Sequence, residues 1–279
     1  MQDQSQSDSW SISQLYEAFI QVYADYPVKF NPTPEGFRIR LSKLNLDKYF
    51  TATYMSQEKI AGFILYTIND YQSKKTAYNG GTGVLPQFRG KGVIDYLFDK
   101  SLDKLRNAGA QRILLEVIDS NAYAIKLYER LEFEYTRTLK SYKKKKASVT
   151  SIPKILLKKS RELKSEYRMF KDFETSFIDS DHQLPFNLTN ELIVEAYVQN
   201  ELAGYIIYQP HAGRISQLAV GVNHRGKKLA TALISYAEVT SSRSLTILNI
   251  PESELQTIAA LEALGFVNEL NQFEMELLI

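Results

Sequence analysis

The stretch GGTGVLPQFRGKGV, residues 80–93, decides how this chain is interpreted. It runs from an apolar strand through a glycine-rich turn into a segment with helical spacing. Glycine has no Cβ atom and lets backbone amides approach an anion closely, and the first N–H groups of a helix have no partners within that helix. The helix dipole favours negative charge at the same place. The stretch therefore predicts a phosphate cradle, with a pyrophosphate as its natural ligand.

A glycine turn before a helix is also an ordinary tight connection, so the stretch alone does not identify a ligand. It lacks the Gly-Lys-Ser/Thr ending of a P-loop and the third glycine of a dinucleotide-binding fingerprint. It also follows several predicted strands instead of the first. These differences argue against nucleoside triphosphates and NAD.

The residues around the stretch predict an alternation of helices and strands. Apolar residues recur at helical spacing from Ile12 to Tyr23, with Ser11 and Gln14 as a capping box, and a short helix follows Pro34. Strands are predicted over residues 49–55, 60–68, 76–84, 113–118 and 133–139, the first two as a hairpin. Helices are predicted from the end of the stretch to Gly109 and over Ala122–Leu131.

The second half of the chain repeats this order of elements. Strands are predicted over residues 193–198, 203–208, 215–222 and 245–250, with a helix over 229–240, a helix ending at Leu264 and a last strand. Arg225-Gly226-Lys227 falls on Arg89-Gly90-Lys91, and Leu264-Gly265-Phe266 falls on Leu131-Glu132-Phe133. An internal duplication follows, with domains over residues 1–146 and 147–279. The Lys-rich segment Ile152–Phe177 is predicted to be helical and to open the second domain.

Composition limits the classes of partner. The 34 basic residues nearly balance 32 acidic ones, so no protein-wide field calls for nucleic acid or an anionic membrane. A dense basic cluster, Lys140 with Lys143–Lys146, is predicted to be a solvated linker face, with a polyanion contact as the alternative. There is no cysteine, the histidines lack metal-site spacing, and no apolar run is long enough to span a bilayer. We expect a cytoplasmic protein without a metal, and an oligomer stays possible.

Residues 87–92, Gln-Phe-Arg-Gly-Lys-Gly, fit the Q/R-x-x-G-x-G/A signature of the GCN5-related N-acetyltransferase (GNAT) superfamily. Downstream, Leu115-Glu116-Val117 with Asn121, Tyr128 and Phe133 resembles the second half of that family's core. The resemblance implies an α/β (α+β) fold of tandem GNAT-like domains, each a mixed, mostly antiparallel central sheet flanked by helices. It also implies acetyl-CoA as cosubstrate and a small-molecule or peptide amine as acceptor.

The resemblance assigns roles residue by residue. The residues implied to hold coenzyme A are Thr82, Gly83, Val84, Gln87, Phe88, Arg89, Gly90, Lys91, Gly92, Val93 and Asn121. Tyr128 matches the family's general acid, with a core tyrosine as the alternative. Glu116 is the candidate general base, with a solvent-paired carboxylate as the alternative.

These roles predict an N-acetyltransferase in which an amine attacks the thioester directly in the N-terminal domain. A non-catalytic, coenzyme A-responsive regulatory or scaffold protein is the alternative. In the second repeat, Lys228, Glu254 and Leu261 stand in place of Gly92, Asn121 and Tyr128. We therefore expect the C-terminal domain to be degenerate, with residual coenzyme A binding left open.

Overall fold

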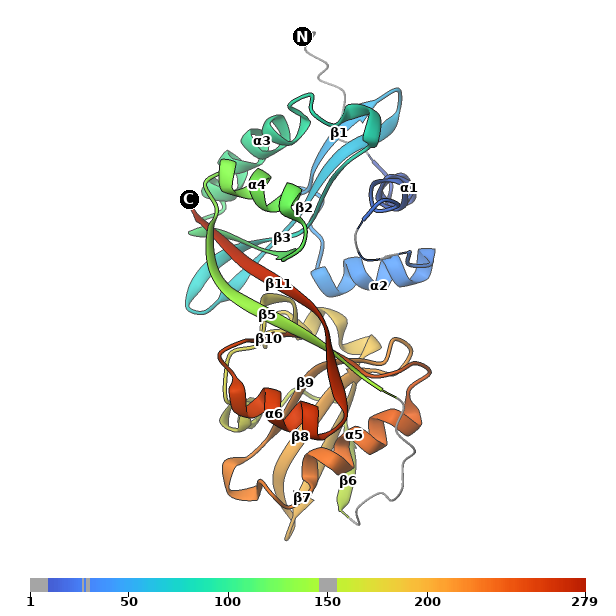
Figure 1. Cartoon of the computed structure of the whole chain (residues 1–279), viewed down its shortest axis with the longest axis vertical. Coiled ribbons are helices and arrows are strands. Elements are labelled where there is room, and N and C mark those ends of the chain that lie inside the picture. The colour runs from blue at the N-terminus through green and yellow to red at the C-terminus, as the bar shows by residue number, and fades with distance from the viewer. Residues whose placement is uncertain (1–9, 27, 29–30, 146–154) are drawn as a thin grey trace. The chain divides into compact units, whose positions relative to one another are not determined.

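The computed structural model describes residues 10–26, 28, 31–145 and 155–279 (Figure 1). Within it the chain forms two compact units. Unit 1 comprises Met1–Glu116, Ser120–Glu134 and Glu276–Ile279, and unit 2 comprises Val117–Asp119 and Tyr135–Met275. The predicted domain boundary at residues 146 and 147 lies outside the described residues.

Unit 1 has the predicted order of elements. They are α1 (Ile12–Val22), α2 (Pro34–Leu44), β1 (Ala52–Ser56), β2 (Lys59–Tyr71), β3 (Lys74–Val84), a 3-10 turn (Pro86–Phe88), α3 (Val93–Asn107), β4 (Arg112–Ile118) and α4 (Ala122–Arg130). The capping box of α1 is confirmed, because Ser11 Oγ accepts from Gln14 N and Gln14 Oε1 accepts from Ser11 N. The hairpin is confirmed as well, and its turn places Gln57 and Glu58 at positive φ.

Helices cover both faces of the unit 1 sheet. Phe63 of β2 stacks against Phe19 of α1, whereas a Cβ atom at the neighbouring Gly62 would meet Val93 of α3. Because successive strand residues point to opposite faces, α1 and α3 lie on opposite sides. An ion pair of 2.6 Å between Arg130 and Asp95 ties α4 to α3, and Figure 1 shows these two helices together.

The strand order of unit 1 is β1-β2-β3-β4, and the far edge of β4 is covered by the end of β11 (Phe266–Leu278). Ile279 N donates to Gln111 O at 3.2 Å, and Arg112 Nη1 donates to Glu276 Oε2 at 2.6 Å. The last four residues of the chain are therefore part of unit 1.

Unit 2 contains the second repeat together with a strand from the first. Its elements are β5 (Glu134–Lys144), β6 (Leu156–Ser160), β7 (Leu192–Val198), β8 (Glu201–Gln209), β9 (Arg214–Val220), α5 (Leu229–Thr240), β10 (Thr246–Pro251), α6 (Leu255–Ala263), most of β11 and several short 3-10 turns. The strand order is β11-β5-β10-β9-β8-β7-β6, in which β10 pairs with β5. Side chains such as Ile206, Leu233 and Phe266 form the core.

Two predictions about the middle of the chain are wrong. Where a helix was predicted over Ile152–Phe177, the described part begins with β6, which pairs with β7, and continues in 3-10 turns; residues 152–154 lie outside the described residues. Nor is the basic cluster a linker face: Lys140 and Lys144 lie on β5, paired with Glu252 at 2.9 Å and Glu238 at 3.5 Å. Lys146 itself is outside the described residues.

Candidate active site

Strands β3 and β4 separate in the middle of unit 1. Their parallel pairing runs from Thr76 opposite Arg112 to Asn79 opposite Leu115, although both strands continue beyond it. At the same point β3 has a bulge against β2, because Leu65 pairs with Gly81 and Tyr66 pairs with Asn79, which leaves Gly80 as the extra residue. The bulge re-aims β3 and opens a split between it and β4.

Glycine is required along this part of β3 because helices lie directly against its backbone. A Cβ atom at Gly83 would stand 2.3 Å from Val22 Cγ1 of α1, and one at Gly80 would stand 2.5 Å from Leu44 Cδ1 of α2. At Gly81 the nearest atoms would be 3.4 Å away or more. The glycines therefore serve close packing at two positions, whereas a Cβ atom at the third would meet only ordinary van der Waals contacts.

The predicted phosphate cradle follows β3 as a 3-10 turn and a loop that leads into α3. Gly90 and Gly92 have φ values of 70° and 73°, and Gly92 is the N-cap of α3. A Cβ atom at either glycine would meet nothing within 4 Å, and Arg89 Nε fixes the loop by donating to Val84 O at 3.2 Å. The first amides of α3 thus face a space bounded by exposed backbone, as an anion site requires.

Tyr128 lies on α4 and reaches toward the split. Its hydroxyl forms a hydrogen bond with the Thr82 side chain, and burial raises the pKa of Tyr128 to about 12. Thr82 is in turn held by Asn79, whose Nδ2 donates to its hydroxyl at 2.8 Å. Two predicted site residues, Thr82 and Tyr128, therefore meet, and the tyrosine stays protonated at neutral pH.

Asn121 has a structural partner as well as its predicted ligand. It is the N-cap of α4, and its Oδ1 accepts from Ala124 N at 3.2 Å. Its side chain also hydrogen bonds the Tyr26 hydroxyl, which lowers a pKa that burial raises. Asn121 consequently connects the start of α4 to the segment that follows α1.

Glu116 stands on β4 directly beyond the last residue that pairs with β3. The hydroxyl of Tyr78, on β3, donates to Glu116 Oε2. Their side chains share one face of the sheet, the face that α2 covers at Gly80. Glu116 is therefore held by a cross-strand partner, unlike the solvent-paired carboxylate that was the alternative.

Sequence reasoning missed several residues around the split. Tyr23 Oη donates to Thr82 O at 3.3 Å, and burial raises the pKa of Tyr23. Arg40 of α2 donates to Gly80 O at 2.9 Å, and Tyr26 contacts Asn121 as described. These side chains come from elements outside the shared motifs. In the sequence, only the two tyrosines that follow α1, Tyr23 and Tyr26, pointed to them.

The second repeat keeps the loop but differs in the side chains beside it. Gly226 and Lys228 have φ values of 75° and 63°, so the loop before α5 has the backbone conformation of its counterpart. The residue in place of Gly81 is Gln217, which accepts from Tyr205 Oη at 2.9 Å and donates to Asp179 O at 2.7 Å. Leu261, in place of Tyr128, is buried at 2% exposure.

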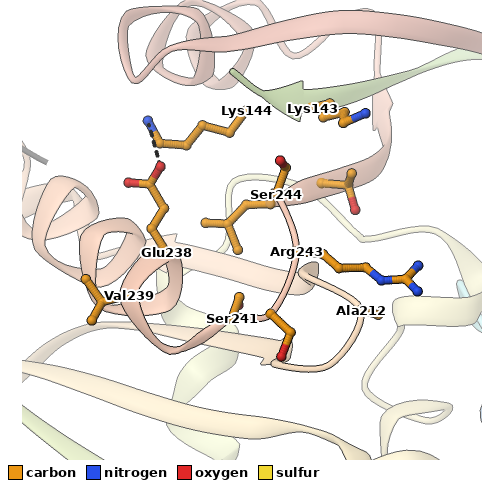
Figure 2. Close-up of a pocket in the computed structure, with 11 residues that line it drawn as sticks. Lys143, Lys144, Ala212, Glu238, Val239, Ser241, Arg243 and Ser244 are labelled. Carbon is orange, nitrogen blue, oxygen red and sulfur yellow. Dashed lines mark ion pairs between the residues drawn. The ribbon is translucent and has the colours of Figure 1, made fainter. Parts of the chain in front are cut away.

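A pocket of about 740 Å³ lies in unit 2, at the end of α5 and β5 (Figure 2). It contains none of the predicted site residues. Lys144, on its wall, pairs with Glu238 at 3.5 Å and donates to Leu264 O at 2.6 Å.

Among the described residues, no group of three or more His, Asp or Glu side chains could hold a metal ion, and no helix is long and apolar enough to cross a membrane.

The same α/β order of strands and helices therefore occurs twice in one chain. The chain belongs to the Acetyltransferase (GNAT) family, whose model matches residues 13–133 and 157–266. A putative acetyltransferase from Pyrococcus horikoshii has a similar structure, with a TM-score of 0.70 at 15% identity over 96% of this chain and 86% of that one. So does a tandem GNAT protein from the clavulanic acid biosynthesis pathway, with a TM-score of 0.68 at 15% identity over 96% and 94%.

Curated relatives match a shorter part of the chain. The N-alpha-acetyltransferase 30 of Schizosaccharomyces pombe is 40% identical over 60 residues, which is 21% of this chain and 40% of the relative. An N-alpha-acetyltransferase of Saccharolobus solfataricus is 42% identical over 60 residues, 21% of this chain and 36% of the relative. The chain thus spans less than half the length of the curated relatives it matches.

Proposed function

We propose that this protein transfers the acetyl group of acetyl-CoA to a primary amine, and that unit 1 performs the reaction. The observation that carries the proposal is the split between β3 and β4, with a protonated tyrosine and a held carboxylate beside it. Acetyl-CoA supplies a thioester whose carbonyl carbon the amine attacks. The amides of residues 87–93 would hold its pyrophosphate, and Thr82–Val84 and Asn121 its pantetheine arm.

Unit 1 fits this cosubstrate in two respects. The loop before α3 presents backbone amides with no side-chain atom within 4 Å of the Cβ positions of Gly90 and Gly92, which suits an anion. Beyond Asn79 the β3 backbone has no pairing with β4, so an extended arm could lie beside it in place of a strand.

Proton management then falls to two side chains. Glu116 would accept a proton from the attacking amine as the carbon–nitrogen bond forms, and Tyr128 would donate its proton to the departing sulfur as the carbon–sulfur bond breaks. Orientation along the split supplies the remaining catalysis. The second repeat lacks the proposed acid, because the buried Leu261 stands in place of Tyr128.

We further propose an α-amino group as the acceptor, because both curated relatives are N-alpha-acetyltransferases. An α-amine has a pKa near 8, so about a tenth of it is neutral and reactive at pH 7, far more than of a lysine side chain.

Thiol release from acetyl-CoA tests the proposal with matched acceptors: a peptide with a free N-terminus, the same peptide with an acetylated N-terminus and an internal lysine, and free amino acids. We expect release with the free N-terminus. Equal use of the blocked peptide would reject the α-amino assignment. Absence of both thiol release and acetyl-CoA binding would reject the transferase, and binding without transfer to any amine would favour the regulatory alternative.

A further inference from the structure

The hydrogen bond between Tyr78 and Glu116 is a cross-link at the point where two strands part. Tyr78 pairs with Leu114, and the next pair, Asn79 with Leu115, is the last between β3 and β4. Glu116 is the first β4 residue beyond it, and Tyr78 reaches diagonally to its carboxylate. The bond therefore links the strands just where their backbone pairing ends.

Burial makes this bond a strong constraint on the carboxylate. Tyr78 is 6% exposed, so its hydroxyl has little access to water, and its ring has few alternative positions. A hydroxyl that donates to a carboxylate favours the ionised form, and such charge-assisted bonds are about twice as strong as neutral ones. Tyr78 thus limits the rotamer of Glu116.

Other charged or titratable groups of unit 1 lie near the same end of the split. Arg40 of α2 donates to Gly80 O, and the Tyr23 hydroxyl donates to Thr82 O. Tyr26 lies beside Asn121. Tyr78 donates directly to the Glu116 carboxylate.

We propose that Tyr78 is a positioning residue for the general base: it holds the Glu116 carboxylate at the apex of the split. The inference rests on the proposed acetyl transfer in unit 1. Tyr78 itself exchanges no proton with the amine; the proton from the amine goes to Glu116, and the bond from Tyr78 stabilises the carboxylate that receives it.

Tyr78→Phe removes the hydroxyl and keeps the ring. We expect the acid limb of the kcat/KM profile to move to higher pH by about one unit, because a bond to the ionised carboxylate is lost. At pH values on the acid limb this gives an approximately tenfold lower kcat/KM, with binding of acetyl-CoA unchanged. The matched control is Tyr16→Phe, which removes a hydroxyl bonded to the backbone oxygen of Pro32 and should leave the pH profile in place.

A double-mutant cycle separates positioning from a general loss of structure. In the Glu116→Gln background, adding Tyr78→Phe should cost no further activity, because the group it acts through is gone. If the activity losses of the two substitutions add, or if the acid limb of Tyr78→Phe does not shift, the inference about Tyr78 is wrong. The proposed acetyl transfer would not be affected by either result. An active Glu116→Gln enzyme would overturn it too, whereas wild-type protein that neither binds nor consumes acetyl-CoA would show that the proposed function had failed.

Discussion

The hydroxyl of Tyr128 has one demanding role in the proposed reaction, protonation of the departing sulfur. Burial raises its pKa to about 12 from an ordinary 10.0, so the proton stays on the oxygen until the thiolate forms. Tyr128→Phe should lower kcat by about 10²-fold or more, with little change in acetyl-CoA affinity. Steady-state kinetics and calorimetric binding measure the two quantities, and a kcat within twofold of wild type would reject the assignment.

The same shift has a consequence for stability at high pH. A folded-state pKa above the unfolded value means that the stabilisation is fully present below about pH 10 and is lost as pH rises toward 12. Tyr128→Phe should therefore lose less unfolding free energy than wild type between about pH 10 and 12. Urea unfolding at a series of pH values measures this, and parallel pH curves for the two proteins would contradict it.

Asn121 combines a helix cap with a predicted contact to pantetheine, and two substitutions separate these roles. Asn121→Ala should lower the free energy of unfolding by about 1 kcal/mol, because Ala124 N loses its cap. Asn121→Ser keeps a capping oxygen and should restore most of that stability. Both variants lack the amide, so both should bind acetyl-CoA roughly three- to tenfold more weakly. Full affinity in the serine variant would show that capping is the only role.

At the scale of elements, the glycines of β3 set the distance between the sheet and its helices. Gly83→Ala would place Cβ 2.3 Å from Val22 Cγ1, so α1 must move, at a cost of about 1–3 kcal/mol. Gly81→Ala meets only ordinary contacts of 3.4 Å or more and should change stability by less than about 1 kcal/mol. The protein contains one tryptophan, Trp10, buried in unit 1, so its fluorescence during urea unfolding reports on this unit. Equal losses for both variants would contradict this explanation.

Elements with a strong local signal were predictable, and those decided by pairing were not. The capping box of Ser11 and Gln14 marks the start of α1 whatever surrounds it. Leu156 and Leu157 carry no comparable signal, because their strand forms by pairing with β7, and this pairing overrode an apparent helical spacing. Likewise, the lysines of β5 looked solvated because their carboxylate partners, such as Glu252, come from distant parts of the chain.

The site divides in the same way. The loop before α3, Asn121, Glu116 and Tyr128 could be predicted because each belongs to a motif contiguous in sequence. Tyr26, Arg40 and the partnership of Tyr78 with Glu116 depend on how α1, α2 and β3 pack. No local pattern distinguishes such a tyrosine from one in the core.

At the scale of the whole molecule, the ends of the two repeats are exchanged. β5 ends the first repeat in sequence but pairs with β10 in unit 2, and the end of β11 completes unit 1. The alternation of apolar and polar residues in a strand does not show which of two similar sheet edges the strand pairs with. An exchange of strands between the repeats therefore could not be predicted. One consequence is that the first repeat alone lacks residues 276–279, which belong to its own unit.

The charge on Glu276 makes this dependence measurable in the full chain. Arg112 is 4% exposed, donates to Thr76 Oγ1 and Tyr71 O, and pairs with Glu276 at 2.6 Å. Breaking a buried pair by removing one partner leaves an uncompensated charge, so Glu276→Ala should destabilise unit 1 by about 3–5 kcal/mol. Lys74 also contacts Glu276, at 3.5 Å, but is 44% exposed, so Lys74→Ala should cost at most about 1 kcal/mol.

Trp10 fluorescence reads the outcome in unit 1, while backbone circular dichroism follows both units. We expect Glu276→Ala to move the fluorescence transition to a lower urea concentration. Lys74→Ala should unfold at nearly the same urea concentration as wild type. If both variants unfold like wild type, Arg112 does not depend on the carboxylate, and the first repeat can be expected to fold without the end of the chain. If only Glu276→Ala unfolds at a lower urea concentration, the C-terminal residues are as much a part of the proposed catalytic unit as β4 itself.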